Sequence, residues 1–228
     1  MTIAANLTAV RARIAAACSA VGRDPGEVRL LPVSKTRPSV DVLAAFQAGV
    51  VRFGENRAQE AAAKAAELAG SGVEWAMIGH LQVNKAKLVA RFASEFQALD
   101  SVELAAELDR RLLAAGRTLD VLIQVNTSGE ATKSGLAAGE VAAFARRLRP
   151  FEALRVRGLM TIAAPSPDPA VVSGCFETLR TAQAALRDQG VSGQDYDELS
   201  MGMSGDFELA IQHGATVIRI GTAIFGPR

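Results

Sequence analysis

Short apolar runs alternate with longer helical patterns along most of the chain. After an amphipathic helical segment at residues 1–24, eight apolar runs of strand length follow. They cover residues 28–34, 50–55, 74–80, 95–100, 119–126, 154–162, 197–203 and 216–225. Several of them, such as "VLIQV" and "VIRI", are apolar at nearly every position, which is typical of parallel strands buried on both faces. The pattern therefore predicts an α/β protein built on a parallel sheet.

Polar residues stand where three of the helices are expected to begin. Asn56, Ser204 and an Asp100–Glu103 capping box can each accept hydrogen bonds from the first free N–H groups of a helix. Eight strand–helix units after an extra N-terminal helix predict a (β/α)8 barrel of the TIM type, with an open doubly wound sheet as the alternative. No linker or repeat divides the sequence, so residues 1–228 are predicted to form a single domain.

Composition and charge exclude several classes of partner. The net charge is +1, from 25 basic and 24 acidic residues, which leaves no electrostatic footprint for nucleic acid or an anionic membrane. No run reaches the roughly 18 apolar residues that a membrane-spanning helix needs. Arg11 and Arg13 interrupt the N-terminal segment, so it does not read as a signal peptide, and a cytoplasmic location is expected. Cys18 and Cys175 lie far apart and match no zinc-binding spacing.

The last two predicted strands are followed by residues suited to binding phosphate. In a (β/α)8 barrel, functional groups gather at the carboxyl ends of the strands, and phosphate often binds after strands seven and eight. Ser204 and Gly205 stand at an expected helix N-terminus, where free N–H groups favour an anion. Gly221 allows close approach of the backbone, and Thr222 adds a hydroxyl donor. Either motif alone is explained by a helix cap and a packing glycine, whereas both together favour a phosphate site.

Two basic residues in strand patterns and one histidine leave alternatives open. Arg219 lies within an apolar strand, where burial requires a partner, which is either a carboxylate across the core or a ligand. Lys35 ends the first strand, and three roles are open for it. It is a solvated side chain, a contact to phosphate, or a neutral amine that reacts with a phosphorylated aldehyde. His80 is explained most simply as a hydrogen-bonded histidine at a strand end, since the sequence supports neither a Ser–His–Asp relay nor a metal site.

Seven segments, in order along nearly the whole chain, carry a resemblance to a known family. They are "LLPVSKTRP", "FGENRAQE", "WAMIGHLQVNK", "SGEATKSGL", "RGLMTI", "LSMGMSGDFELAIQHGAT" and "IRIGTAIFG". The chain resembles the pyridoxal phosphate homeostasis protein family, whose barrel is similar to the N-terminal domain of alanine racemase. The resemblance implies that pyridoxal 5'-phosphate (PLP) is the cofactor.

The resemblance also implies roles for nine residues. Lys35 would hold the cofactor aldehyde as an internal aldimine. Arg219 would face the pyridine nitrogen, and Asn56 would lie beside the ring or its hydroxyl. Met201 and His80 would be further pocket residues. Four residues would bind the phosphate: Ser204, Gly205, Gly221 and Thr222.

The family is described as non-enzymatic. The resemblance therefore implies a carrier that buffers PLP and delivers it, with PLP-dependent apoenzymes as candidate recipients, and that influences amino-acid and keto-acid balance. Racemases of similar fold use a C-terminal β-domain and a tyrosine base. This sequence ends at Arg228 soon after the eighth predicted strand, and its single tyrosine, Tyr196, precedes strand seven, near the opposite end of the barrel. A monomer without robust catalysis is therefore expected. A weak racemase using Lys35 alone, or a sugar-phosphate isomerase, is the alternative.

Overall fold

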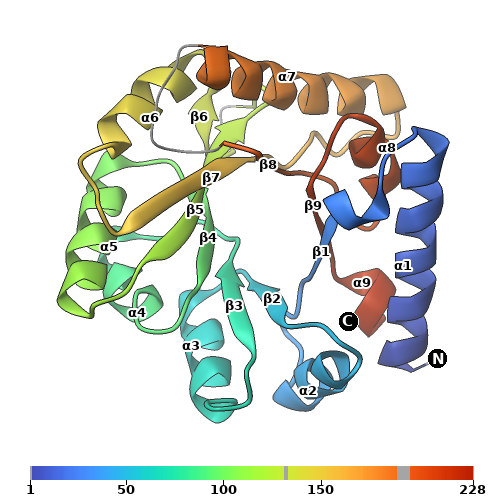
Figure 1. Ribbon diagram of the computed structural model, residues 1–228, viewed down its shortest axis with the longest axis horizontal. Helices are drawn as coiled ribbons and strands as arrows, with labels where there is room; N and C mark the ends of the chain where they lie inside the picture. The colour runs from blue at the N-terminus through green and yellow to red at the C-terminus, as the bar shows by residue number, and fades with distance from the viewer. Residues whose placement is uncertain (1, 131–132, 189–195, 228) are drawn as a thin grey trace.

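Eight parallel strands form a nearly closed barrel in the computed structural model, which describes residues 2–130, 133–188 and 196–227 (Figure 1). Neighbouring strands follow the order β1-β9-β8-β7-β5-β4-β3-β2. A parallel bridge between Val33 and Gly54 joins the two ends of this order, where the Ser34 N–H also donates to the Gly54 carbonyl at 3.0 Å. The predicted (β/α)8 barrel with an extra N-terminal helix is confirmed, and the open sheet is excluded.

The strands agree with the predicted runs in number and order around the barrel. Their bounds are β1 Arg29–Pro32, β2 Arg52–Glu55, β3 Glu74–Met77, β4 Glu95–Leu99, β5 Leu119–Asn126, β6 Leu136–Ala137, β7 Leu154–Met160, β8 Glu198–Ser200 and β9 Val217–Ile220. The two-residue strand β6 was not predicted; it pairs with β5 outside the barrel order. The run at 216–225 also differs, because the strand ends at Ile220. Phe225 N–H instead donates to the Gly221 carbonyl at 3.0 Å within a short helix.

The helices surround the barrel (Figure 1). Their bounds are α1 Ile3–Ala20, α2 Ser39–Gln47, α3 Ala58–Glu67, α4 Ala86–Val89, α5 Val102–Ala114, α6 Val141–Leu148, α7 Pro169–Asp188, α8 Phe207–Gln212 and α9 Thr222–Phe225. Three short 3-10 turns are η1 Pro25–Glu27, η2 Val83–Lys85 and η3 Ala138–Glu140. None of these described helices combines the length and the apolar character that crossing a bilayer requires.

The extra helix α1 packs on the last two helices of the chain. Its buried residues Leu7, Val10, Ile14 and Cys18 recur at helical spacing and form one apolar face. This face lies against α2, α8 and α9, so α1 covers the side of the barrel where β9 meets β1 (Figure 1). Cys18 and Cys175 are both buried free thiols.

All three predicted caps are wrong. The cap of α5 is Ser101, whose Oγ accepts from Leu104 N–H at 3.1 Å, so the neighbouring Asp100 is not needed. Helix α3 begins after Arg57 without a side-chain cap, which leaves Asn56 outside the helix. Helix α8 begins after Asp206 and not after Ser204, because residues 203–206 first make a turn.

Candidate functional site

A cavity of about 300 Å³ lies at the carboxyl ends of the strands. Its lining comes from the segments after β1, β2, β3, β7, β8 and β9. Among the lining residues are seven of the nine predicted from the sequence: Lys35, Asn56, Ser204, Gly205, Arg219, Gly221 and Thr222. The fold therefore gathers a lysine, an arginine and two hydroxyl side chains around one cavity.

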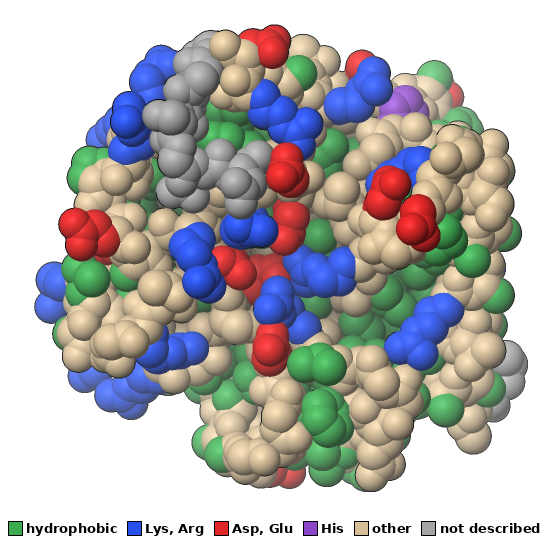
Figure 2. Space-filling view, in the orientation of Figure 1, with side chains coloured by type: hydrophobic (Ala, Val, Ile, Leu, Met, Phe, Trp, Pro, Cys, Tyr) green, Lys and Arg blue, Asp and Glu red, His purple; other side chains and the backbone are tan. Residues whose placement is uncertain are grey.

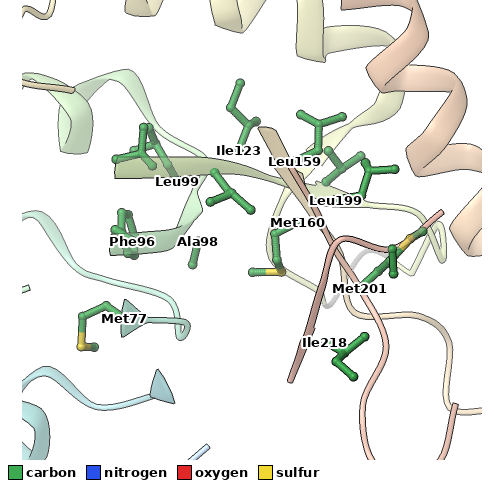
Figure 3. Close-up of a cluster of buried hydrophobic side chains, with 14 of the residues drawn as sticks. Met77, Phe96, Ala98, Leu99, Ile123, Leu159, Met160, Leu199, Met201 and Ile218 are labelled. Atoms are coloured by element: carbon green, nitrogen blue, oxygen red, sulfur yellow. The ribbon is translucent and has the colours of Figure 1, made fainter. Parts of the chain in front are cut away.

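The other two predicted residues lie elsewhere. Met201 is fully buried and packs in the apolar core with Met160 and Ile218 (Figure 3). His80 is more than half exposed, with Nδ1 at 3.7 Å from an oxygen of Asp100. It lines an adjoining cavity of about 260 Å³, which shares Asn56 with the first. Neither side chain belongs to the lining of the main cavity.

Lys35 is held at the cavity by the backbone on both sides of its strand end. Val33 N–H donates to the Ile220 carbonyl at 2.9 Å, and Ser34 N–H donates to the Gly54 carbonyl at 3.0 Å. The segment is therefore fixed between β9 and β2. Lys35 is half-buried and is one of the residues that line the cavity.

The segments after β8 and β9 present backbone N–H donors that no other described residue accepts from. Within the described residues, no hydrogen bond is made by the N–H groups of Ser204 and Gly205 in the turn before α8, or by that of Thr222 at the start of α9. The hydroxyl groups of Ser204 and Thr222 likewise have no hydrogen-bond partner among the described residues. Gly221 lies so close to the segment after β1 that an added Cβ would meet the Val33 carbonyl oxygen at 3.3 Å. These groups are suited to binding an anion with several acceptor oxygens.

Arg219 lines the cavity with only 4% of its surface exposed. Its Nη1 donates to Ser200 Oγ and its Nη2 donates to the Thr161 carbonyl, both at 2.7 Å. No carboxylate of the described residues lies within 4 Å of the guanidinium. Burial lowers the pKa of Arg219 to about 10, so the group stays charged at neutral pH. The alternative of an ion pair across the core is thus excluded within the described chain.

A line of hydrogen bonds, here called the polar column, runs from Arg219 through the barrel interior. Ser200 Oγ donates to Gln97 Oε1 at 2.7 Å, and Gln97 Nε2 donates to Glu95. Glu95 is in turn paired with Arg52 at 2.5 Å and with Arg29 at 3.0 Å. The polar column therefore connects the cavity with the strand starts at the other end of the barrel.

The far end of the polar column is rich in charge. Figure 2 shows basic and acidic side chains gathered at the centre of one face, over the strands. Burial opposes ionisation of Glu95, but the charges of Arg29 and Arg52 and the Gln97 hydrogen bond hold its pKa below the ordinary value. This network was not among the features predicted from the sequence. The available signal was the presence of polar residues, Gln97 and Ser200, inside otherwise apolar strands.

Arg37 is a further cavity residue that the sequence analysis missed. Its Nη2 donates to the Gly226 carbonyl and, at 2.8 Å, to the Pro227 carbonyl. Both Arg37 and Gly226 line the cavity. The bonds therefore fix residues 226–227 at the cavity rim, next to the segment that carries Lys35.

Comparisons with known proteins agree with this geometry. Residues 5–228 match the family model described as alanine racemase, N-terminal domain. The pyridoxal phosphate homeostasis protein of Pseudomonas aeruginosa is 44% identical over 227 residues, covering 100% of this chain and 96% of its own. The protein of the same name from Escherichia coli K12 is 42% identical over 229 residues, covering 99% and 97%.

A solved structure is also similar to this chain over nearly its full length. PipY of Synechococcus elongatus PCC7942, with PLP bound, matches with a TM-score of 0.87 and 35% identity, over 99% of this chain and 100% of that chain. The fold, the cavity at the strand ends and the identity over nearly the full length agree. The chain therefore belongs to the pyridoxal phosphate homeostasis protein family, within the alanine racemase N-terminal domain group.

Proposed function

We propose that this protein binds PLP covalently through Lys35 and acts in intracellular PLP homeostasis, by buffering and delivering the cofactor without robust catalysis. The observation that carries the proposal is the combination of groups around one cavity: a lysine, backbone N–H donors without a hydrogen-bond partner among the described residues, and a buried guanidinium that none of those residues pairs with a carboxylate within 4 Å. The relatives named above are pyridoxal phosphate homeostasis proteins, and PipY is described with PLP bound.

The chemical groups of PLP match the cavity one by one. The phosphate has acceptor oxygens for the N–H groups of Ser204, Gly205, Gly221 and Thr222, together with the two hydroxyls. The pyridine nitrogen is an acceptor for Arg219, whose positive charge disfavours protonation of that nitrogen. The aldehyde is the partner of Lys35. Asn56, at the end of β2, lines the cavity where it can contact the ring or its hydroxyl.

Two features support a carrier over a racemase. When bound, PLP supplies an electron sink for reactions at amino-acid carbons, but a cation at the ring nitrogen weakens that sink. Racemisation also needs a proton donor or acceptor on each face of the substrate. The single tyrosine of the chain, Tyr196, is buried immediately before β8, so it precedes the strand whose far end faces the cavity.

Delivery of the cofactor requires that the bound aldehyde be reached from solvent. The half-buried side chain of Lys35 and the cavity at the open ends of the strands support exchange with an acceptor. The same proposal has the protein act in the cytoplasm as a monomer that hands PLP to PLP-dependent apoenzymes. Light scattering during size-exclusion chromatography tests the monomeric state.

The test is a visible absorbance spectrum of the purified protein before and after borohydride reduction, followed by peptide mapping. We expect a yellow protein whose reduced adduct maps to Lys35. Lys35→Ala should lose the adduct and keep its unfolding midpoint, while Lys87→Ala, at an exposed lysine of α4, should behave as the unaltered chain. An adduct that persists at another lysine in Lys35→Ala, or fast racemisation of alanine by the unaltered protein, would overturn the proposal.

A further inference from the structure

A buried lysine on α3 contacts the segment that carries Lys35. Only 7% of the Lys64 surface is exposed. Its Nζ donates to the Ser34 carbonyl at 2.8 Å, to Glu55 Oε1 at 2.7 Å and to Glu60 Oε1 at 2.8 Å. These three acceptors match the three N–H donors of an ammonium group. Lys64 is therefore fully satisfied and has no donor left for a ligand.

The two carboxylates that hold Lys64 also hold the residues on either side of Lys35. Glu55 Oε1 accepts from Ser34 Oγ at 2.7 Å, and Glu60 Oε1 accepts from the Thr36 N–H at 2.5 Å. One ammonium group thus connects both neighbours of Lys35 through two carboxylates. We call Lys64, Glu55 and Glu60 the lysine clamp.

The segment needs such support because its backbone is strained. Thr36 has φ of 65°, in the left-handed region that residues with a Cβ rarely adopt. A β-branched residue held there carries on the order of 1–3 kcal/mol of strain. The hydrogen bond from the Thr36 N–H to Glu60 opposes relaxation of this turn, and Lys64 holds the same Glu60 oxygen in place.

The lysine clamp depends on the cation that Lys64 supplies to a buried carboxylate, Glu55. Glu55 is fully buried, and its Oε2 has no partner among the described residues. Burial raises the pKa of Glu55, an effect that the hydrogen bonds from Lys64 and Ser34 oppose. Removal of Lys64 would leave that carboxylate without a cation in a dry site, where an unpaired charge is strongly unfavourable.

We propose that Lys64 is a positioning residue for Lys35, fixing the backbone of residues 34–36 so that the Lys35 amine meets the cofactor aldehyde. This inference rests on the proposed function. In the reaction, the Lys35 nitrogen bonds to the aldehyde carbon, and the aldehyde oxygen leaves as water with two amine protons. The rate depends on how closely the nitrogen is aligned, since displacement by about 1 Å can slow a reaction on the order of 100-fold.

The test separates alignment of the amine from binding of the cofactor. The first variant is Lys64→Met. The second combines Lys64→Met with Glu55→Gln, which keeps the net charge of the unaltered protein and removes the buried carboxylate that would lack a cation. It replaces the single variant if that one fails to fold. Lys87→Met, at an exposed lysine, is the matched control. Each is prepared without cofactor, and the rate of adduct formation with added PLP is followed by absorbance. The dissociation constant for PLP is measured separately with each change placed in Lys35→Ala, where binding is non-covalent.

We expect the rate of adduct formation in the clamp variants to fall by about 10-fold to 100-fold. When the same changes are placed in Lys35→Ala, the non-covalent dissociation constant for PLP should stay within about twofold of that of Lys35→Ala alone. Lys64→Arg, which keeps the charge, should recover part of the rate. An unchanged rate, or a fall in rate matched by an equal loss of non-covalent affinity, would overturn the positioning role. If the unaltered protein forms no adduct at Lys35, the proposed function itself has failed, which is a distinguishable result.

Discussion

Replacement of Ser200 by alanine interrupts the polar column next to the cavity. The Ser200 hydroxyl accepts from Arg219 Nη1 and donates to Gln97 Oε1, both at 2.7 Å. All three side chains are buried, so hydrogen bonds to bulk water replace the lost partners poorly. Ser200→Ala therefore removes two hydrogen bonds while leaving the apolar packing of the barrel almost unchanged.

The expected loss of stability follows from those two groups. A buried polar group deprived of its partner costs about 1–3 kcal/mol, which gives about 2–6 kcal/mol for the pair. We expect the lower part of this range, about 2–4 kcal/mol, because Arg219 Nη2 still donates to the Thr161 carbonyl. For a chain of this length, that loss corresponds to a fall in Tm of roughly 5–15 °C.

Urea unfolding followed by circular dichroism measures the change in the free energy of unfolding. Ser173→Ala, at a half-buried serine of α7, is the control variant. The control should move the free energy of unfolding by less than about 0.5 kcal/mol. If Ser200→Ala also stays within that margin, the hydrogen bonds of the polar column do not stabilise the barrel. A spectrum of the PLP-loaded variant then reports whether Arg219 has moved.

Three further changes test other parts of the site. Arg219→Ala should shift the absorbance of bound PLP and weaken its binding, because the ring nitrogen loses its cation; an unchanged spectrum and affinity in a PLP titration would contradict this role. Ser204→Ala should weaken binding of inorganic phosphate on the order of 10-fold, because one hydroxyl donor is lost. The Tm should stay unchanged, because α8 begins after Asp206 and Ser204 does not cap it. A lower Tm would indicate that Ser204 stabilises the start of that helix. The pKa of Glu95 is lowered in the folded state, so ionised Glu95 contributes stability that is fully present above its ordinary pKa of 4.5. This contribution is lost as pH falls through the folded-state pKa, so the urea midpoint should decline in acid, and less steeply for Glu95→Gln. Parallel curves of urea midpoint against pH for the two proteins would refute this.

The barrel could be predicted from the sequence because strand-length apolar runs alternate with helices eight times. The positions of strand ends then indicated where polar residues would meet, which placed Lys35, Arg219 and the glycine–hydroxyl pairs around one cavity. Met201 was harder to place, because successive residues at a strand end face opposite sides, and a shift of one position moves a side chain from the cavity to the core.

The caps and the buried networks could not be read in the same way. Asp206 precedes α8 because a turn at 203–206 comes first, and the sequence does not fix that turn. Lys64 stands in an alanine-rich helix, where a lysine is usually solvated; its burial depends on how α3 packs against the end of β2. The polar column joins residues far apart in the chain, and only the order and register of the strands bring Gln97 next to Ser200.

The burial of Arg219 has a consequence for the lifetime of the protein. Its charge is desolvated, and no carboxylate of the described residues pairs with it within 4 Å, so a ligand acceptor that binds there stabilises the folded state alone. At a free ligand concentration 100 times Kd, folding gains about 2.7 kcal/mol, which lowers the unfolded fraction about 100-fold. Proteases act on that unfolded fraction, so degradation slows as occupancy rises. Under the proposed function, the abundance of the carrier would then follow the supply of its cofactor.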